Sequence, residues 1–408
     1  MLPFQKISYL LTIGFVLLLP VSVSNIANAQ QGHETTAEKI NDLMAELTEE
    51  GFSGAVLVAD DGNILLSQGY GFANREDEIP NTPDTVFHIG SVSKQFTGAA
   101  IVRLEMDGLL STEDSIDQYF ENVPTDKAAI TIHQLLTHTS GLKGFGMIGN
   151  FGQLSRDEVV KAVLASKLVS PPGDRMLYSN GGYTLLAAII EIASGQTYQQ
   201  YLENKLFQPA EMTNSGFKDE AWGDTTVAQG YVDDAAVTRD FHGWGLLGAG
   251  GIYSTVNDLY KWYQALQGEL VLSTSAKEKF LGPHVAENEG DFFYAYGWSI
   301  GNSPLGPKVV WHNGGDGIFN ADFKWFPDEG TVIIVLSNRA FSDGWEFPAE
   351  YASIQIELTL FSPPQANYLD YWAGVGGANN SATNARISLT MGTRISSPFG
   401  PTCGIASP

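Results

Sequence analysis

A serine and a lysine lie three residues apart at the start of an apolar run, in the stretch FHIGSVSKQFTGAAIVRLEMDG (residues 87–108). Residues i and i+3 share one face of a helix, so the amine of Lys94 is expected within reach of the Ser91 Oγ. A helix N-terminus also offers unpaired N–H groups and a positive potential, which favour a neutral amine and a developing oxyanion. Ser91 and Lys94 are therefore candidates for a nucleophile and its base. For these two residues alone, a helix-capping serine beside a solvated lysine is the alternative.

The spacing by itself is weak evidence, because Ser-x-x-Lys occurs three times in the chain. The copies that begin at Ser140 and Ser215 each have a glycine after the serine and lie in loop-like sequence. Only Ser91, which follows Gly90, begins a sustained helical pattern.

A second chemical element is Tyr178-Ser179-Asn180, the only Tyr-x-Asn in the chain, in a glycine-rich loop ahead of a long apolar helical run. A loop tyrosine commonly packs half-buried. At a helix entrance beside an ammonium, however, the pKa of the phenol is lowered and the group can relay protons. The amide of Asn180 has two donors and an acceptor, which suit a substrate amide.

The third element is KVVWHNGG, residues 308–315, in which β-forming residues lead into a His-x-Gly pattern. Glycines at a strand edge leave backbone N–H groups open to a docked, extended substrate. His312, Gly314 and Gly315 are therefore candidate binding residues. The same short pattern occurs at His88-Ile89-Gly90, so it is not informative alone.

The elements that must position these residues follow from the apolar spacing. Helical spacing predicts an amphipathic helix over residues 35–49. Two β-rich runs, Ala55–Ala59 and Ile64–Gln68, flank a turn signal and predict a hairpin. Further strand patterns lie in residues 292–338, and a helix is expected near Pro348–Leu360.

Strands at both ends of the chain and helices in the middle predict an α+β fold, with one antiparallel sheet flanked by helices and interrupted by an all-helical insertion. A site is expected in the cleft between the two parts. The predicted organisation is a signal peptide over residues 1–29, one folded domain over 30–361 (an α/β part, 30–115 and 290–361, and a helical part, 116–289) and a flexible Gly/Ser/Asn/Pro-rich tail over 362–408.

The first 29 residues have the pattern of a secretory signal. Lys6 precedes an apolar stretch too short for a confident membrane span, and Ala27-Asn28-Ala29 forms a small-x-small cleavage signal before Gln30. We therefore expect an exported protein, periplasmic or extracellular, without a stable membrane anchor after cleavage. A retained anchor helix is the alternative.

Composition and missing motifs exclude several classes of function. The net charge of −24, about −25 after loss of the signal-peptide lysine, repels phosphate backbones and excludes nucleic acid as a partner. Cys403 is the single cysteine, so neither an intrachain disulfide nor a cysteine zinc site is expected. The absence of His-Glu-x-x-His and Gly-x-Ser-x-Gly argues against a zinc hydrolase and an α/β-hydrolase. His133 and His138 are five apart, a poor spacing for metal ligands, and are assigned to helix packing.

In this order, the three chemical elements resemble those of the serine penicillin-recognising family, which includes class C β-lactamases, D-Ala-D-Ala carboxypeptidases, D-aminopeptidases and related esterases. The likeness covers roughly residues 38–360 and includes LLTHTSGL at 135–142 and GAGGIYSTVNDLYKW at 248–262. The resemblance implies a β-lactamase/transpeptidase-like fold and a serine hydrolase that needs no metal or other cofactor.

The resemblance also implies a role for each candidate residue. Ser91 would be the acyl-accepting nucleophile, and Lys94 would deprotonate it or hold the hydrogen-bond network that does so. Tyr178 would be the partner acid/base that passes a proton to the leaving group.

The remaining candidates would bind the substrate. Asn180 would contact a substrate amide, with His312 and Gly314 as further binding residues. The backbone N–H groups of Ser91 and Gly315 would form the oxyanion hole.

One departure from the family bears on the substrate. Class C β-lactamases carry Lys-Thr-Gly on this strand, and here His312 replaces the lysine. A histidine is mostly neutral at pH 7, so a permanent cation for a substrate carboxylate is missing. The apolar, glycine-lined stretch GWGLLGAGG at 243–251 likewise suits acyl esters or uncharged peptides.

Three functions remain open. The preferred one is an exported serine hydrolase that acts through a Ser91 acyl-enzyme on an amide, peptide or ester bond of a small molecule or peptide. A class C-like β-lactamase is the first alternative, and a non-catalytic protein that binds cell-wall peptides or serves as a scaffold is the second. The oligomeric state does not follow from the sequence.

Overall fold

The computed structural model of the protein describes residues 23–143, 154–218, 222–237, 243–287, 292–342 and 348–362. Its central element is an eight-stranded antiparallel sheet in the order β2-β1-β14-β13-β12-β11-β10-β9. In chain order these strands are β1 (Gly54–Asp60), β2 (Asn63–Tyr70), β9 (Val285–Ala286), β10 (Phe293–Tyr294), β11 (Ser299–Asn302), β12 (Lys308–Gly315), β13 (Asn320–Phe326) and β14 (Thr331–Ser337).

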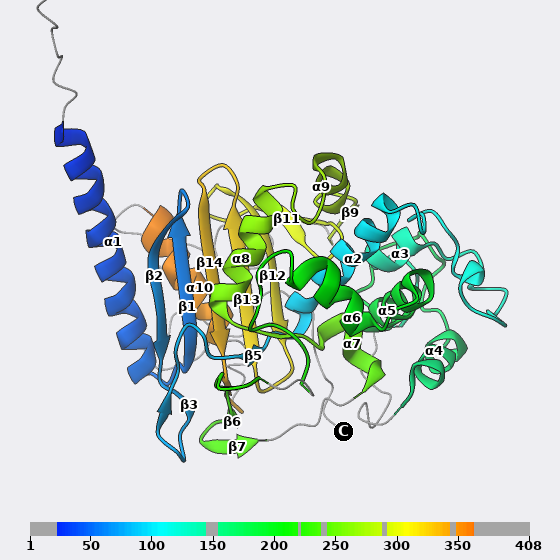
Figure 1. Ribbon diagram of the computed structural model, residues 1–408, viewed down its shortest axis with the longest axis horizontal. Helices are drawn as coiled ribbons and strands as arrows, with labels where there is room; N and C mark the ends of the chain where they lie inside the picture. The colour runs from blue at the N-terminus through cyan, green and yellow to red at the C-terminus, as the bar shows by residue number, and fades with distance from the viewer. Residues whose placement is uncertain are drawn as a thin grey trace, which may run out of the picture.

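Helices cover both faces of the sheet. Figure 1 shows α1 at one end of the molecule, the helical part at the other, and the sheet between them. The α-helices are α1 (Val23–Glu49), α2 (Lys94–Met106), α3 (Ile132–Leu136), α4 (Arg156–Ala165), α5 (Asn180–Ser194), α6 (Tyr198–Leu202), α7 (Leu247–Gly250), α8 (Val256–Gln267), α9 (Thr274–Phe280) and α10 (Pro348–Phe361).

Shorter elements connect these parts. Three 3₁₀ turns span Gly90–Ser93, Ile116–Gln118 and Trp244–Leu246, and a π turn spans Glu203–Phe207. The short strands are β3 (Phe72–Asn74), β4 (Ile79–Pro80), β5 (Phe87–His88), β6 (Gly230–Val232), β7 (Ala235–Val237), β8 (Tyr253–Ser254) and β15 (Arg339–Ala340).

The sheet separates two apolar cores. Successive side chains of a strand point to opposite faces, and β1 shows this alternation. Ala55 and Leu57 join the large core shared with the helical part, whereas Val56 and Val58 join the smaller core under α1 and α10. Because β1 is buried on both faces, its sequence is apolar at nearly every position.

Two buried helices lie behind the site. α2 and α5 pack on each other within the large core. Most of α2 is buried around its circumference, including the polar Lys94 and Gln95, and most of α5 from Gly181 to Ile190 is buried as well. Helices that are apolar all round are buried on all sides, which makes α2 and α5 a rigid support for whatever lies at their N-termini.

Most of the expected elements are confirmed, and so is the fold class. The helix over residues 35–49 lies within α1, the hairpin is β1–β2, and the helix near Pro348–Leu360 is α10. Two details differ from the prediction. Ser91 lies in the 3₁₀ turn Gly90–Ser93, which directly precedes α2, and the predicted helical part also contains the short strands β6, β7, β8 and β9.

The predictions for the chain ends remain predictions. Residues 1–22 and 363–408 lie outside the described residues, and the predicted cleavage point after Ala29 falls within α1. Within the parts of the chain that the structure describes, no helix is both long and apolar enough to cross a membrane.

Candidate active site

The candidate nucleophile and its lysine meet at the start of α2. The Lys94 Nζ donates to Ser91 Oγ at 3.0 Å and to the carbonyl oxygen of Ala249, at the end of α7, at 2.7 Å. Ser91 is 5% exposed and Lys94 is fully buried. The turn–helix junction therefore holds an amine against the hydroxyl, in the arrangement expected of an activated serine.

Tyr178 reaches this pair from the helical part. Its ring centroid lies 4.7 Å from Lys94 Nζ, and that of Tyr183 lies 5.5 Å from the same atom. The Ser179 hydroxyl caps α5 by accepting the Gly182 N–H at 3.3 Å, which places Tyr178 just outside the helix N-terminus. Ser91, Lys94 and Tyr178, separated by up to 87 positions in the sequence, thus form one cluster.

The glycines at the end of β12 lie against the nucleophile turn. A Cβ added to Gly314 would lie 2.1 Å from the Ile89 carbonyl oxygen and 2.9 Å from the Ser91 nitrogen. A Cβ added to Gly90, whose φ is +51°, would lie 2.7 Å from the Gly315 nitrogen. Only glycine permits so close an approach of two backbones. The predicted oxyanion-hole residues Ser91 and Gly315 are therefore brought together.

His312 is in the site but is not available as a cation. Its Nδ1–H donates to the Asn313 carbonyl oxygen at 2.5 Å, and its Nε2 accepts the Tyr294 hydroxyl at 3.0 Å. Burial and, after it, the charge of Lys94 lower the pKa of His312 to about 3, and the hydrogen bond to Asn313 opposes both. At neutral pH the imidazole is neutral, with both nitrogens occupied within the protein.

Asn180 is placed to receive a polar group. It is the first residue of α5, and its side chain is half-buried. Its carbonyl Oδ1 is buried and has no hydrogen-bond partner among the described residues. A buried acceptor without a partner costs free energy, so a donor supplied by a substrate would satisfy it.

His138 belongs to the site, and its assignment to helix packing is wrong. It follows the end of α3, with φ of +58°, and both neighbours of Tyr178 bind it. The Leu177 N–H donates to its carbonyl oxygen at 2.8 Å, and the Ser179 N–H donates to its Nδ1 at 3.1 Å. Its ring lies 4.3 Å from the Tyr178 ring. His138 therefore holds Tyr178 on both sides and across its face.

The imidazole of His138 is also uncharged at neutral pH. Burial, followed by the charge of Lys94 and the proximity of His312, lowers the pKa of His138 well below its usual value. Because Nδ1 accepts a hydrogen bond, the proton is on Nε2. The sequence signal for this role is slight, since a histidine in LLTHTSGL resembles any packed loop residue. His133 instead contacts Tyr296 and His284 and contacts none of the three candidate catalytic residues in the interactions described here.

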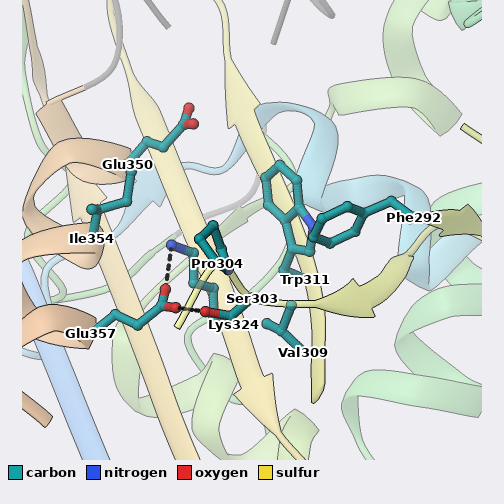
Figure 2. A pocket seen from close by; sticks show the side chains of 9 residues that line it. All are labelled: Phe292, Ser303, Pro304, Val309, Trp311, Lys324, Glu350, Ile354 and Glu357. Carbon is teal, nitrogen blue, oxygen red and sulfur yellow. Dashed lines mark hydrogen bonds and ion pairs between the residues drawn. The ribbon is translucent and has the colours of Figure 1, made fainter. Parts of the chain in front are cut away.

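A pocket separate from the candidate site lies on the opposite face of the sheet (Figure 2). It is a cavity of about 20 Å³ between the sheet and α10. Lys324 Nζ donates to the Glu357 carboxylate at 3.2 Å, and the Ser303 hydroxyl donates to the same carboxylate. Asn313 Nδ2 donates to Glu350 at 3.1 Å. Because Asn313 follows His312 on β12 and faces the other way, this cluster backs the active-site strand without entering the site.

Comparison with known proteins identifies the family. A family model described as Beta-lactamase matches residues 38–355. The putative penicillin-binding protein PbpX of Bacillus subtilis (strain 168) is 33% identical over 309 residues, covering 74% of this chain and 75% of that protein. The octameric penicillin-binding protein homologue from Pyrococcus abyssi has a TM-score of 0.71 at 30% identity, covering 79% of this chain and 77% of that one. The chain belongs to the β-lactamase family.

A further relative carries a hydrolase name. The teichoic acid D-alanine hydrolase of Staphylococcus aureus (strain MRSA252) is 27% identical over 295 residues, covering 70% of this chain and 70% of that protein. The family predicted from the sequence motifs is thus confirmed.

Proposed function

We propose that this protein is an exported serine hydrolase that cleaves an acyl ester or amide through a covalent Ser91 intermediate. One observation carries the proposal: Lys94 Nζ lies 3.0 Å from Ser91 Oγ and 4.7 Å from the centroid of the Tyr178 ring. A nucleophile, an amine and a phenol within one buried cluster are the parts that acyl transfer requires.

In the proposed mechanism, Ser91 Oγ attacks the substrate carbonyl and forms the acyl bond while its proton passes, by way of the Lys94 amine, to the phenolate oxygen of Tyr178. The negative charge on the carbonyl oxygen is stabilised by the N–H groups of Ser91 and Gly315. The bond to the leaving group then breaks, and the leaving group takes the proton from Tyr178. Water hydrolyses the acyl-enzyme through the same groups, which returns Ser91 to its starting state.

The preferred substrate has no free carboxylate beside the scissile bond. A β-lactam or a D-Ala-D-Ala peptide presents such a carboxylate, and its recognition calls for a cation or a free donor. His312 provides neither, because burial and Lys94 keep it neutral and both its nitrogens are bonded within the protein. An ester or a D-amino-acid amide fits these properties better. The relative named a teichoic acid D-alanine hydrolase supports D-alanyl compounds as first candidates.

The test compares rates on short p-nitrophenyl esters, a D-alanyl ester, a D-amino-acid amide, a D-Ala-D-Ala peptide and nitrocefin. We expect the ester or the amide to be hydrolysed fastest, and Ser91→Ala to lose at least about 1,000-fold in kcat. A fluorophosphonate should add one label to the wild-type chain and none to Ser91→Ala.

Ser215→Ala is the matched control, because Ser215 also begins a Ser-x-x-Lys pattern and is buried, with its hydroxyl bonded to Asp258 at 2.9 Å. It should keep both activity and labelling. A nitrocefin rate that exceeds the others by orders of magnitude would favour the β-lactamase alternative. Absence of labelling and of turnover on every substrate would favour a binding protein.

A further inference from the structure

A buried histidine–carboxylate pair lies directly behind the candidate oxyanion hole. His88 ends β5, three residues before Ser91, and its Nδ1–H donates to Asp316 Oδ2 at 2.8 Å. Its Nε2–H donates to the Gly250 carbonyl oxygen at 2.5 Å. His88 and Asp316 are only 3% and 5% exposed. The function proposed above does not use this pair.

The hydrogen-bond partners fix the orientation of the pair. The Gly250 carbonyl oxygen can only accept, so Nε2 of His88 carries a hydrogen, and Nδ1 shares a hydrogen with Asp316 Oδ2. The other carboxylate oxygen, Asp316 Oδ1, accepts the N–H groups of Ile318 at 2.7 Å and Phe319 at 2.8 Å. The carboxylate is thereby held in the turn that follows β12.

Each anchor of His88 neighbours a group of the proposed mechanism. Gly250 follows Ala249, whose carbonyl oxygen accepts the amine of Lys94. Asp316 follows Gly315, the proposed oxyanion donor. His88 itself leads through Ile89 into the Gly90–Ser93 turn. Three segments distant in the sequence, β5, α7 and the end of β12, are thus tied together by one side chain.

We propose that His88 and Asp316 are positioning residues that set the distance between the Ser91 N–H and the Gly315 N–H. The inference rests on the proposed function, because it concerns the oxyanion hole of the same site. The two donors belong to separate segments that meet through glycine backbone, where no side chain fills the contact. An oxyanion hole requires both donors about 3 Å from the oxyanion, and a shift of about 1 Å costs up to about 100-fold in rate.

A purely structural pair would behave differently. Loss of either partner of a buried hydrogen-bonded pair destabilises a protein in any case, because the other polar group is left unsatisfied. The readout must therefore report on the oxyanion hole itself. A thionoester, in which sulfur replaces the carbonyl oxygen, serves this purpose because sulfur is a weak hydrogen-bond acceptor that gains little from the two N–H groups.

The experiment measures kcat and KM for a matched oxoester and thionoester with the wild type, His88→Gln, Asp316→Asn and the double variant. We expect the oxoester kcat to fall about 10- to 100-fold in each variant, with KM changed less than about threefold. The thionoester rate should fall much less, so the oxoester-to-thionoester rate ratio drops about tenfold or more. The double variant should be little worse than either single one, because both substitutions break one contact.

Two further variants separate folding from positioning. His88→Arg keeps donors for both partners of His88, and it should retain most of the oxoester rate and of the ratio. Asp258→Asn removes another buried carboxylate, which accepts the Asn214 N–H at 2.6 Å and pairs with Lys261 at 2.7 Å away from the site. It should lower stability and leave the ratio unchanged.

The outcomes are distinguishable. Variants that lose stability but keep the wild-type ratio overturn the positioning role. If His88→Gln and Asp316→Asn do not fold, Asp316→Glu carries the test, because it keeps a carboxyl group and displaces it by one methylene: a lowered ratio supports the positioning role, and a wild-type ratio contradicts it. If the wild type hydrolyses neither ester, the proposed function is wrong, and so is the inference that rests on it.

Discussion

Lys94 is the residue around which the candidate site is assembled. Its fully buried amine contacts Ser91 Oγ and the Ala249 carbonyl oxygen, and it faces the Tyr178 ring. Its charge adds to burial in lowering the pKa values of His138 and His312. The two histidines are therefore neutral at neutral pH, and they act through shape and hydrogen bonding.

Replacement of His312 tests its neutrality through pH-dependent stability. The pKa of His312 is about 3 in the folded protein, against 6.5 for an ordinary histidine. As the pH falls below 6.5, the unfolded chain binds a proton that the folded protein does not bind, so stability is lost. Between pH 7 and pH 5, the wild type should lose about 2 kcal/mol more than His312→Gln does. Urea unfolding at both pH values measures this, and equal losses would show that His312 titrates normally.

His138 offers a second test at the residue scale. His138→Asn tolerates the positive φ and keeps an acceptor for the Ser179 N–H, but it loses the ring against Tyr178. We expect kcat on the best ester to fall about tenfold, with KM nearly unchanged. His138→Phe keeps a ring but leaves the Ser179 N–H without its acceptor, which should cost about 1–3 kcal/mol of stability. An unchanged kcat in His138→Asn would show that the His138 ring does not position Tyr178 for catalysis.

At the scale of elements, β12 joins the active site to the cluster under α10. His312 faces the site, and the next residue, Asn313, faces the other way and donates to Glu350 of α10. Lys324 of β13 pairs with Asp322 at 3.4 Å and with Glu357 at 3.2 Å on the same face. A lysine and three carboxyl groups, Asp322, Glu350 and Glu357, are therefore buried together, which favours a protonated carboxyl.

The raised pKa of Glu350 predicts how the stability of the protein depends on pH. Burial, aided by the nearby Asp322, raises the pKa of Glu350 to about 7 from 4.5. Between these values the folded protein holds a proton that the unfolded chain has released, so this contribution to stability is present at pH 4.5 and is lost as the pH rises through 7. From pH 5 to pH 8, the wild type should lose on the order of 2 kcal/mol more than Glu350→Gln does.

The opposite signs at Glu350 and His312 make the pair of variants a mutual control. Urea unfolding at pH 5, 7 and 8 follows both. A Glu350→Gln variant that loses as much stability as the wild type on going from pH 5 to pH 8 would place the shared proton on another carboxyl of the cluster.

At the scale of the whole molecule, the packing of α1 bears on the predicted export. α1 packs on β2 and α10, and its buried apolar contacts are made by Ile40, Met44 and Leu47, which all follow the predicted cleavage point after Ala29. Cleavage should therefore leave the packing intact.

Expression of the full chain in a bacterium, followed by fractionation, tests this expectation. We expect the protein in the periplasm or medium, with an intact mass that begins at Gln30. A membrane fraction that contains the uncleaved chain would instead favour the retained-anchor alternative.

Local patterns in the sequence determined much of this protein. Alternating and near-continuous apolar runs predicted the hairpin and the strands of the sheet, and the spacing of Ser91 and Lys94 predicted their contact, because these features depend on neighbours within one turn or one strand. The motif order also predicted the family, which the comparisons confirm. Gly314 and Gly315 indicated a strand edge with backbone N–H groups open to a substrate, and the structure shows that this edge also lies against the turn that carries Ser91.

Only the tertiary structure decided how distant segments meet. It brought His138 beside Tyr178, Asp316 against His88 and Tyr294 to His312, across separations that no local pattern encodes. It also decided that His312 is neutral, since a pKa depends on burial and on the charges that surround a group in space. Sequence periodicity specifies which face of an element is buried, whereas the partner of a buried polar group depends on how all the elements pack.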